Sequence, residues 1–148
     1  MELYHYTECG LDNVFIEGMC VPEDDHGEPV YCIRNVTGLH KVIAHGIVNH
    51  RSAMAGNELR FLRTEIGLTQ AEMAQLVHCD AQTVGRWERG ETVMPPPSEA
   101  LIRKHVIEKL ELDSLDTMEE ITRKCVPSAE VEMININGSD PKNYKIAA

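Results

Sequence analysis

Gln82 and Arg86 are the pair of residues in this sequence whose types and spacing best fit a chemical task. Residues at i and i+4 project from the same face of a helix. A glutamine can form two hydrogen bonds with the edge of adenine, and an arginine can bind two acceptors of guanine. The pair therefore predicts a helix that reads base edges in the major groove of DNA.

Neighbouring residues supply further contacts to DNA. Thr69 and Gln70 stand at the predicted N-terminus of the preceding helix, where free backbone amides and the helix dipole attract phosphate. Arg89 is expected to add another phosphate contact. The predicted DNA-binding residues are Thr69, Gln70, Ala81, Gln82, Thr83, Arg86 and Arg89.

The segment from Leu59 to Gly90 must position these side chains, and its sequence predicts three short helices separated by tight turns. Gly67 is suited to end the first helix, and Thr69 to Glu72 form a capping box that starts the second. Asp80 caps the third. The apolar positions expected to form a shared core are Leu59, Leu62, Ile66, Met73, Ala74, Val77, Val84 and Trp87.

The stretch GLTQAEMAQLV, followed by a short turn and TVGRWERGE, resembles the lambda-repressor or XRE class of helix-turn-helix regulators. The resemblance covers about residues 57–107. It implies that Arg63 in the first helix pairs with Glu88 near the end of the recognition helix. It also places the glutamine that contacts the DNA backbone or a base edge at Gln70.

Two positions depart from the pattern of that family. The family often has a polar residue at the position of Ala81. The methyl group of Ala81 leaves either a contact to a thymine methyl or no readout at one base pair. His78 stands in the turn where glycine is usual. This second departure concerns the geometry of the turn rather than the presence of the motif.

The expected fold is mostly α-helical, with a small N-terminal β module followed by a lambda-repressor-like domain. We expect residues 1–54 to form a small α+β module that is a candidate for binding a partner or a toxin. Residues 55–126 are expected to form the helix-turn-helix domain with further C-terminal helices. Residues 127–148 are expected to form an extended segment or tail.

Within the first module, short β-rich runs predict small strands that need support from the rest of the chain. These runs are Leu3 to Tyr6, Val14 to Ile16, Met19 to Val21 and Pro29 to Ile33. Apolar residues at helical spacing predict a helix from Thr37, as the N-cap, to His50. In the C-terminal segment, Val131 to Ile136 alternates and predicts an edge strand or a segment that pairs with a partner.

The layout is also similar to that of MqsA-type antitoxins, in which a zinc-binding module precedes a helix-turn-helix domain. The paired Cys-x-x-Cys motifs of that family are not matched here. Cys9, Cys20, His26 and Cys32 would have to converge to bind zinc, whereas scattered cysteines are more often buried or idle. We therefore expect no metal and no cofactor. No nucleophile motif or cofactor loop is present, so we expect no enzymatic activity.

The net charge is -10, and it is unevenly distributed: residues 1–54 carry 8 acidic and 3 basic groups, and residues 107–148 carry 9 and 5. Acidic flanks suit a basic partner. We find no secretory signal or membrane span and expect a cytoplasmic protein with reduced cysteines. His40, His45 and His50 are five residues apart, so they cannot share one helix face as metal ligands.

These observations predict a sequence-specific DNA-binding regulator, most simply an autorepressing type II antitoxin of a toxin-antitoxin system. It would bind an inverted-repeat operator in double-stranded DNA as a homodimer. The dimer contacts are expected on the helix from Ser98 to Leu112, through Leu101, Val106 and Leu110, or on the segment beyond this helix. A free-standing or phage-type repressor and a protein-binding adaptor are the alternatives.

Overall fold

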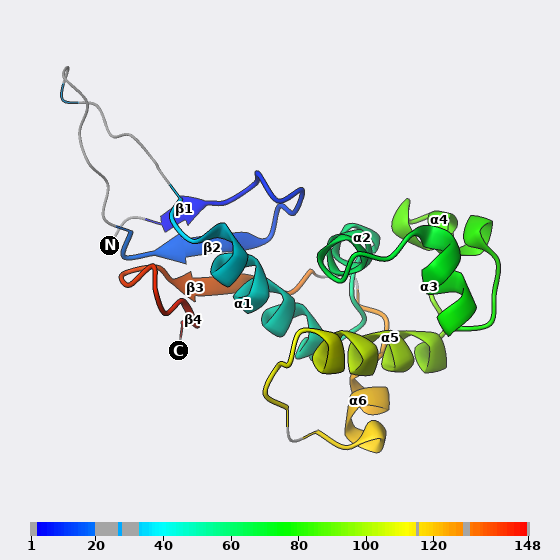
Figure 1. Ribbon diagram of the computed structural model, residues 1–148. Helices are drawn as coiled ribbons and strands as arrows, with labels where there is room; N and C mark the ends of the chain where they lie inside the picture. The colour runs from blue at the N-terminus through cyan, green and yellow to red at the C-terminus, as the bar shows by residue number, and fades with distance from the viewer. Residues whose placement is uncertain (1–2, 20–26, 28–32, 115, 129–130, 148) are drawn as a thin grey trace.

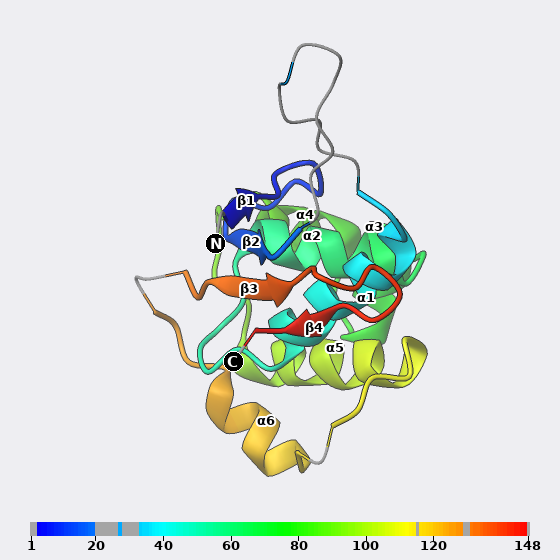
Figure 2. The same ribbon diagram turned by 90° about the vertical axis from the view of Figure 1, so that its left-hand side faces the viewer.

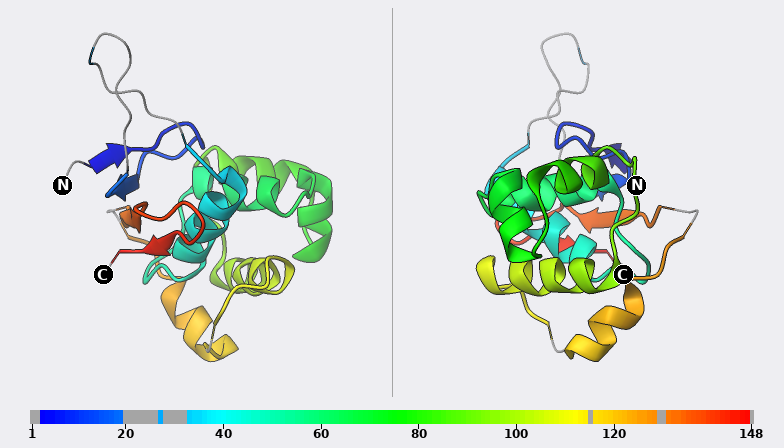
Figure 3. Two further views of the ribbon diagram at one scale, coloured as in Figure 1. Left: turned by 60° about the vertical axis from the view of Figure 1, so that its left-hand side comes forward. Right: turned by 90° about the vertical axis from the view of Figure 1, so that its right-hand side faces the viewer.

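The computed structural model describes residues 3–19, 27, 33–114, 116–128 and 131–147, and most of its ordered elements are helices. The elements in chain order are β1 (Leu3–His5), β2 (Val14–Glu17), α1 (Val36–Val48), α2 (Gly56–Glu65), α3 (Gln70–Leu76), α4 (Ala81–Glu88), α5 (Pro96–Lys109), α6 (Met118–Lys124), β3 (Ile134–Asn137) and β4 (Lys145–Ile146). Figures 1 and 3 show the strands at one end of the molecule and α3 and α4 at the other. The predicted fold class, mostly α with a small β module, is confirmed.

The sheet combines strands from both ends of the chain, in the order β1-β2-β3-β4 (Figure 2). β1 and β2 are antiparallel, β3 and β4 are antiparallel, and the central pair is parallel with Ile16 opposite Ile136. The C-terminal segment is thus not the expected tail, and β3 is not an edge strand. Two short strands are too few to be stable alone, and β3 and β4 supply the missing pairing.

α1 covers one face of this sheet. Leu39, Ile43 and Ile47 of α1 are fully buried, as are Ile16 and Ile136 on the strands. Helix and sheet come together closely at Gly46, where an added Cβ would lie 3.1 Å from Ile134 Cγ2. The sheet and α1 therefore share one apolar layer.

The predicted helix of the N-terminal module is confirmed, but its start is not. Asn35, rather than Thr37, is the N-cap, and its side chain accepts a hydrogen bond from the backbone N–H of Gly38 at 3.2 Å. Asn35 has φ 55°, a left-handed conformation that asparagine tolerates better than most residues. The other two runs predicted as strands, around Met19 to Val21 and Pro29 to Ile33, lie mostly outside the described residues.

The junction near residue 54 is a packed interface between the two halves. Arg103 of α5 is fully buried and donates hydrogen bonds to the carbonyls of His50 at 2.7 Å and Ser52 at 2.6 Å. Glu58 of α2 accepts hydrogen bonds from His50 Nε2 at 2.5 Å and from Asn13 Nδ2 at 3.1 Å. These bonds fix the connection between α1 and α2, which the sequence alone reads as a linker.

Candidate nucleic-acid interface

α3 and α4 begin where their capping residues predict. The Thr69 hydroxyl accepts from the N–H of Glu72 at 3.1 Å, and the Glu72 carboxylate accepts from the N–H of Thr69 at 3.1 Å. Asp80 accepts from both the N–H and the hydroxyl of Thr83 at 2.8 Å, which lowers the pKa of the Asp80 carboxyl. Gly67 directly follows the C-cap of α2 and has φ 72°, a left-handed conformation. Local hydrogen bonds therefore set the ends of these helices.

The predicted core of the three helices is also present. Its fully or nearly buried members are Leu59, Leu62, Met73, Ala74, Val77, Val84 and Trp87. Ile66 packs against them and is partly buried. This core leaves one face of α4 directed outward.

An ion pair implied by the family resemblance fixes α4 against α2. Arg63 Nε lies 2.6 Å from Glu88 Oε2, and Arg63 Nη2 lies 3.2 Å from Glu88 Oε1. Glu88 Oε1 also accepts from Gln70 Nε2 at 3.1 Å, a contact that the sequence did not indicate. Glu88 therefore holds both the first helix and the Gln70 side chain in place.

The outward face of α4 carries the predicted base readers. Gln82 and Arg86 are exposed, and among the described residues neither forms a hydrogen bond to another side chain or to the backbone through its side chain. Ala81 and Thr83 are half-buried in the first turn. The Thr83 hydroxyl bonds Asp80, so it serves the helix cap in the free protein.

Gly85 lies on the same side of α4 as Gln82 and Arg89, which stand three residues before it and four residues after it. A Cβ added to Gly85 would lie 3.0 Å from Arg89 Nη1 and 3.6 Å from the Gln70 carboxamide. The missing side chain thus gives these two polar groups room to meet over the helix. The structure brings Gln70 and Arg89 together at Gly85 of α4.

Arg89 is paired with Glu91, a residue absent from the predicted site. Its Nε donates to Glu91 Oε1 at 3.0 Å and its Nη2 to Glu91 Oε2 at 3.4 Å. This pair raises the pKa of Arg89 and lowers the pKa of Glu91. Only the proximity of the two residues in sequence hinted at the contact.

The turn between α3 and α4 accommodates His78 in the conformation that glycine would adopt. His78 has φ 58°, and the following Cys79 N–H donates to the Ala74 carbonyl at 2.9 Å. The departure from the family pattern therefore leaves the geometry of the turn intact.

The remaining candidate residues do not join this surface. The Cys9 thiol donates to the Tyr6 carbonyl at 3.7 Å, and burial raises its pKa. Cys20, His26 and Cys32 lie outside the described residues. Within the described part of the chain, no group of three or more His, Cys, Asp or Glu side chains is placed to hold a metal ion.

The three histidines predicted to be surface or satisfied core residues are confirmed as such. His40 bonds Tyr6 Oη and Glu65, each at 2.9 Å, and His45 lies 3.2 Å from the Asp113 carbonyl. His50 is buried against Glu58. All three serve contacts between elements.

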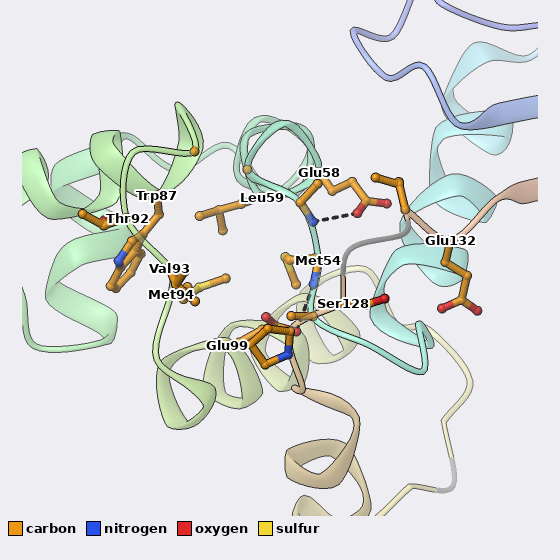
Figure 4. Close-up of a pocket in the computed structure, with 16 residues that line it drawn as sticks. Met54, Glu58, Leu59, Trp87, Thr92, Val93, Met94, Glu99, Ser128 and Glu132 are labelled. Carbon is orange, nitrogen blue, oxygen red and sulfur yellow. Dashed lines mark hydrogen bonds between the residues drawn. The ribbon is translucent and has the colours of Figure 1, made fainter.

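A cavity of about 220 Å³ lies on the inner side of α4, away from the predicted DNA-facing surface. Trp87, Leu59, Met54 and Met94 contribute to its lining (Figure 4). The Glu99 carboxylate at its edge already accepts from Met54 N and from Arg103.

In the part of the chain that the structure describes, no helix is both long and apolar enough to span a membrane.

Comparison with protein families gives a match that falls on this region. Residues 55–104 match the family described as "Helix-turn-helix domain". No curated protein and no solved structure matched the chain. The matched segment spans α2, α3, α4 and the first part of α5. Residues 55–104 therefore form a helix-turn-helix domain of the XRE type, which supports a role in DNA binding and transcriptional regulation.

Proposed function

We propose that the protein reads a specific DNA sequence with Gln82 and Arg86 of α4. The observation that carries this proposal is the exposure of both side chains on a helix held by the Arg63–Glu88 pair. Preorganised side chains lose less entropy on binding, and each good bidentate contact to a base is worth ~1–3 kcal/mol of discrimination. Gln82 matches adenine, and Arg86 matches guanine.

Phosphate contacts would fix the register of α4 on the duplex. Thr69 is exposed at the start of α3, and the partly exposed Gln70 lies beside α4 through its bond to Glu88. Ala81 and Thr83 are at the start of α4, where recognition helices approach base edges. We assign Thr69, Gln70 and Arg89 to contacts with the DNA phosphate backbone. Ala81, Gln82, Thr83 and Arg86 are assigned to the base edges.

The operator would be an inverted repeat bound by a homodimer, because one recognition helix reads few base pairs. The structure narrows the surface that the sequence suggested for dimer contacts. Val106 is fully buried and Leu110 is partly buried, so both serve the fold of the protein itself. Leu101, 44% exposed, remains available on α5. Sedimentation equilibrium would test the dimer, and a monomer at micromolar concentration would contradict it.

An autorepressing antitoxin is the more specific form of this proposal. The sheet lies at the far end of the molecule from α3 and α4, so it could bind a partner while α4 occupies DNA (Figure 1). The acidic flanks favour a basic toxin as that partner. Co-purification of a small basic protein supports this role, whereas tight operator binding without any partner favours a free-standing repressor.

Selection of bound duplexes from a random pool at stated salt tests the base readers. We would compare the wild type with Gln82→Ala/Arg86→Ala and with a matched control, Gln75→Ala/Arg123→Ala, whose residues are exposed and are not assigned to DNA. The wild type and the control should enrich the same inverted repeat. The double substitution in α4 should lose about 2–6 kcal/mol of selectivity. Retained function with that double variant would favour the adaptor alternative.

A further inference from the structure

The acidic side chains around α3 and α4 differ in what they hold. Glu72 and Asp80 cap helices through backbone N–H groups, and Glu88 joins Arg63 and Gln70. Glu91 lies three residues after Glu88. Its carboxylate has only one hydrogen-bonding partner among the described residues, and that partner is Arg89. Glu91 is therefore the one acidic group of this set that is not required to shape the helices.

The position of the Arg89–Glu91 pair is unusual for a surface ion pair because Arg89 belongs to the face that meets DNA. Its Nη1 lies over Gly85, beside the Gln70 carboxamide. Both partners are more than half exposed, at 58% and 54% of their side chains. Arg89 is the main cause of the lowered pKa of the Glu91 carboxyl, and the positive charge of Arg86 also contributes to it. Glu91 thus offsets the charges of two DNA-facing arginines.

A carboxylate and a phosphate compete for the same donors. Glu91 takes Nε and Nη2 of Arg89, one of the two edges through which arginine forms paired hydrogen bonds. With that edge occupied, the Arg89–Glu91 pair as a whole carries little net charge to neutralise a phosphate. Because the pair is exposed, exchange of one acceptor for the other is not costly.

We propose that Glu91 restrains DNA binding by occupying Arg89. The backbone phosphate must compete with a carboxylate of the protein itself, and in many wild-type complexes Arg89 stays paired with Glu91 and neutralises no phosphate. This inference rests on the proposed function, since it assigns Arg89 to the phosphate backbone. It adds that the affinity of the domain is held below the level that its arginines allow. A domain restrained in this way depends more strongly on its base contacts, because part of its sequence-independent attraction is cancelled.

The test measures binding of the full-length protein to a fixed, unselected 20-base-pair duplex by fluorescence anisotropy over a series of salt concentrations. The variants are Glu91→Gln, Arg89→Ala and the double substitution. Glu119→Gln is the matched control, because Glu119 is an exposed glutamate that also pairs with an arginine, Arg123, but on α6. Thermal unfolding of each variant would show that the fold is retained.

Glu91→Gln should tighten binding about three- to tenfold at low salt. It should also steepen the dependence of log K on log salt by roughly 0.9, the value for one additional neutralised phosphate. Glu119→Gln should change neither quantity to that extent. In the Arg89→Ala background, Glu91→Gln should no longer steepen the slope, because the side chain that it releases is missing.

Two results would overturn the inference. Weaker binding by Glu91→Gln would mean that the carboxylate positions Arg89 for DNA rather than restrains it. An unchanged slope would mean that Arg89 contacts no phosphate when released. The unselected duplex separates this test from the proposed function, which fails instead when the wild type enriches no sequence from the random pool.

Discussion

The helix-turn-helix segment and the four-stranded sheet are built in different ways. In the former, contacts between residues close in sequence end each helix, as at Thr69 and Asp80. In the latter, the central parallel pair joins Val14 to Ile134, so the sheet exists only when the two ends of the chain meet. The first region is specified locally and the second by long-range contacts.

The two regions also meet differently from two independent domains. Buried Arg103, Glu99, His50 and Glu58 join α1, α2 and α5 through hydrogen bonds. Glu132, just before β3, accepts from the N–H of Arg51 at 2.8 Å. Substitutions that destabilise the sheet or the junction should therefore also destabilise the helix-turn-helix segment.

Removing Arg103 should produce the largest loss of stability. Arg103→Ala leaves the buried Glu99 carboxylate unpaired and three carbonyls without a donor, a change that typically costs about 3–5 kcal/mol. Urea unfolding monitored by circular dichroism measures it. The neighbouring Lys104→Ala, which removes a partly exposed charge, should lie within about 0.5 kcal/mol of the wild type. Equal effects of the two variants would mean that the halves are independent.

A core substitution in β3 tests whether the C-terminal segment belongs to the fold. Ile136 is fully buried, so Ile136→Ala should reduce the free energy of unfolding by about 2–5 kcal/mol. Asn135→Ala on the exposed face of the same strand is the control, with an expected change near zero. If the segment behaved as a free tail, both variants would unfold like the wild type.

A cap in the locally specified region should matter less. Thr69→Ala removes one hydrogen bond of the capping box at α3 and should cost about 1 kcal/mol. Thr69→Ser keeps the hydroxyl and should restore most of that stability. Comparison of the unfolding midpoints of the two variants in urea isolates the contribution of the cap. Equal midpoints would mean that the Thr69 hydroxyl does not determine where α3 starts.

The smallest expected effect is a gain. His78 occupies a left-handed conformation that costs a non-glycine residue about 1–2 kcal/mol, whereas glycine loses more entropy on folding. His78→Gly should therefore stabilise the protein by roughly 0.5 kcal/mol, measured as a rise in its midpoint of thermal unfolding. Gln75→Gly, inside α3, should have the opposite sign, and a loss with His78→Gly would indicate a contact made by the imidazole.

Residues 57–107 were largely predictable because short-range rules apply to them. Caps, turn spacing and the apolar pattern placed α2, α3 and α4, and the family resemblance supplied the Arg63–Glu88 pair, as the structure confirms. The outward positions of Gln82 and Arg86 also follow from helical periodicity. What they bind remains a proposal to be tested on DNA.

The sequence by itself determined the helical segment, its capping residues and the direction of its polar face, because each depends on residues within a few positions of one another. Only the tertiary structure decided that β3 lies beside β2, that Asn13 and His50 meet Glu58, and that Arg89 folds back over Gly85 toward Glu91. Such contacts depend on how distant or flexible groups are brought together. The hydrophobic period and the spacing of residues along the chain report local structure and do not specify these contacts.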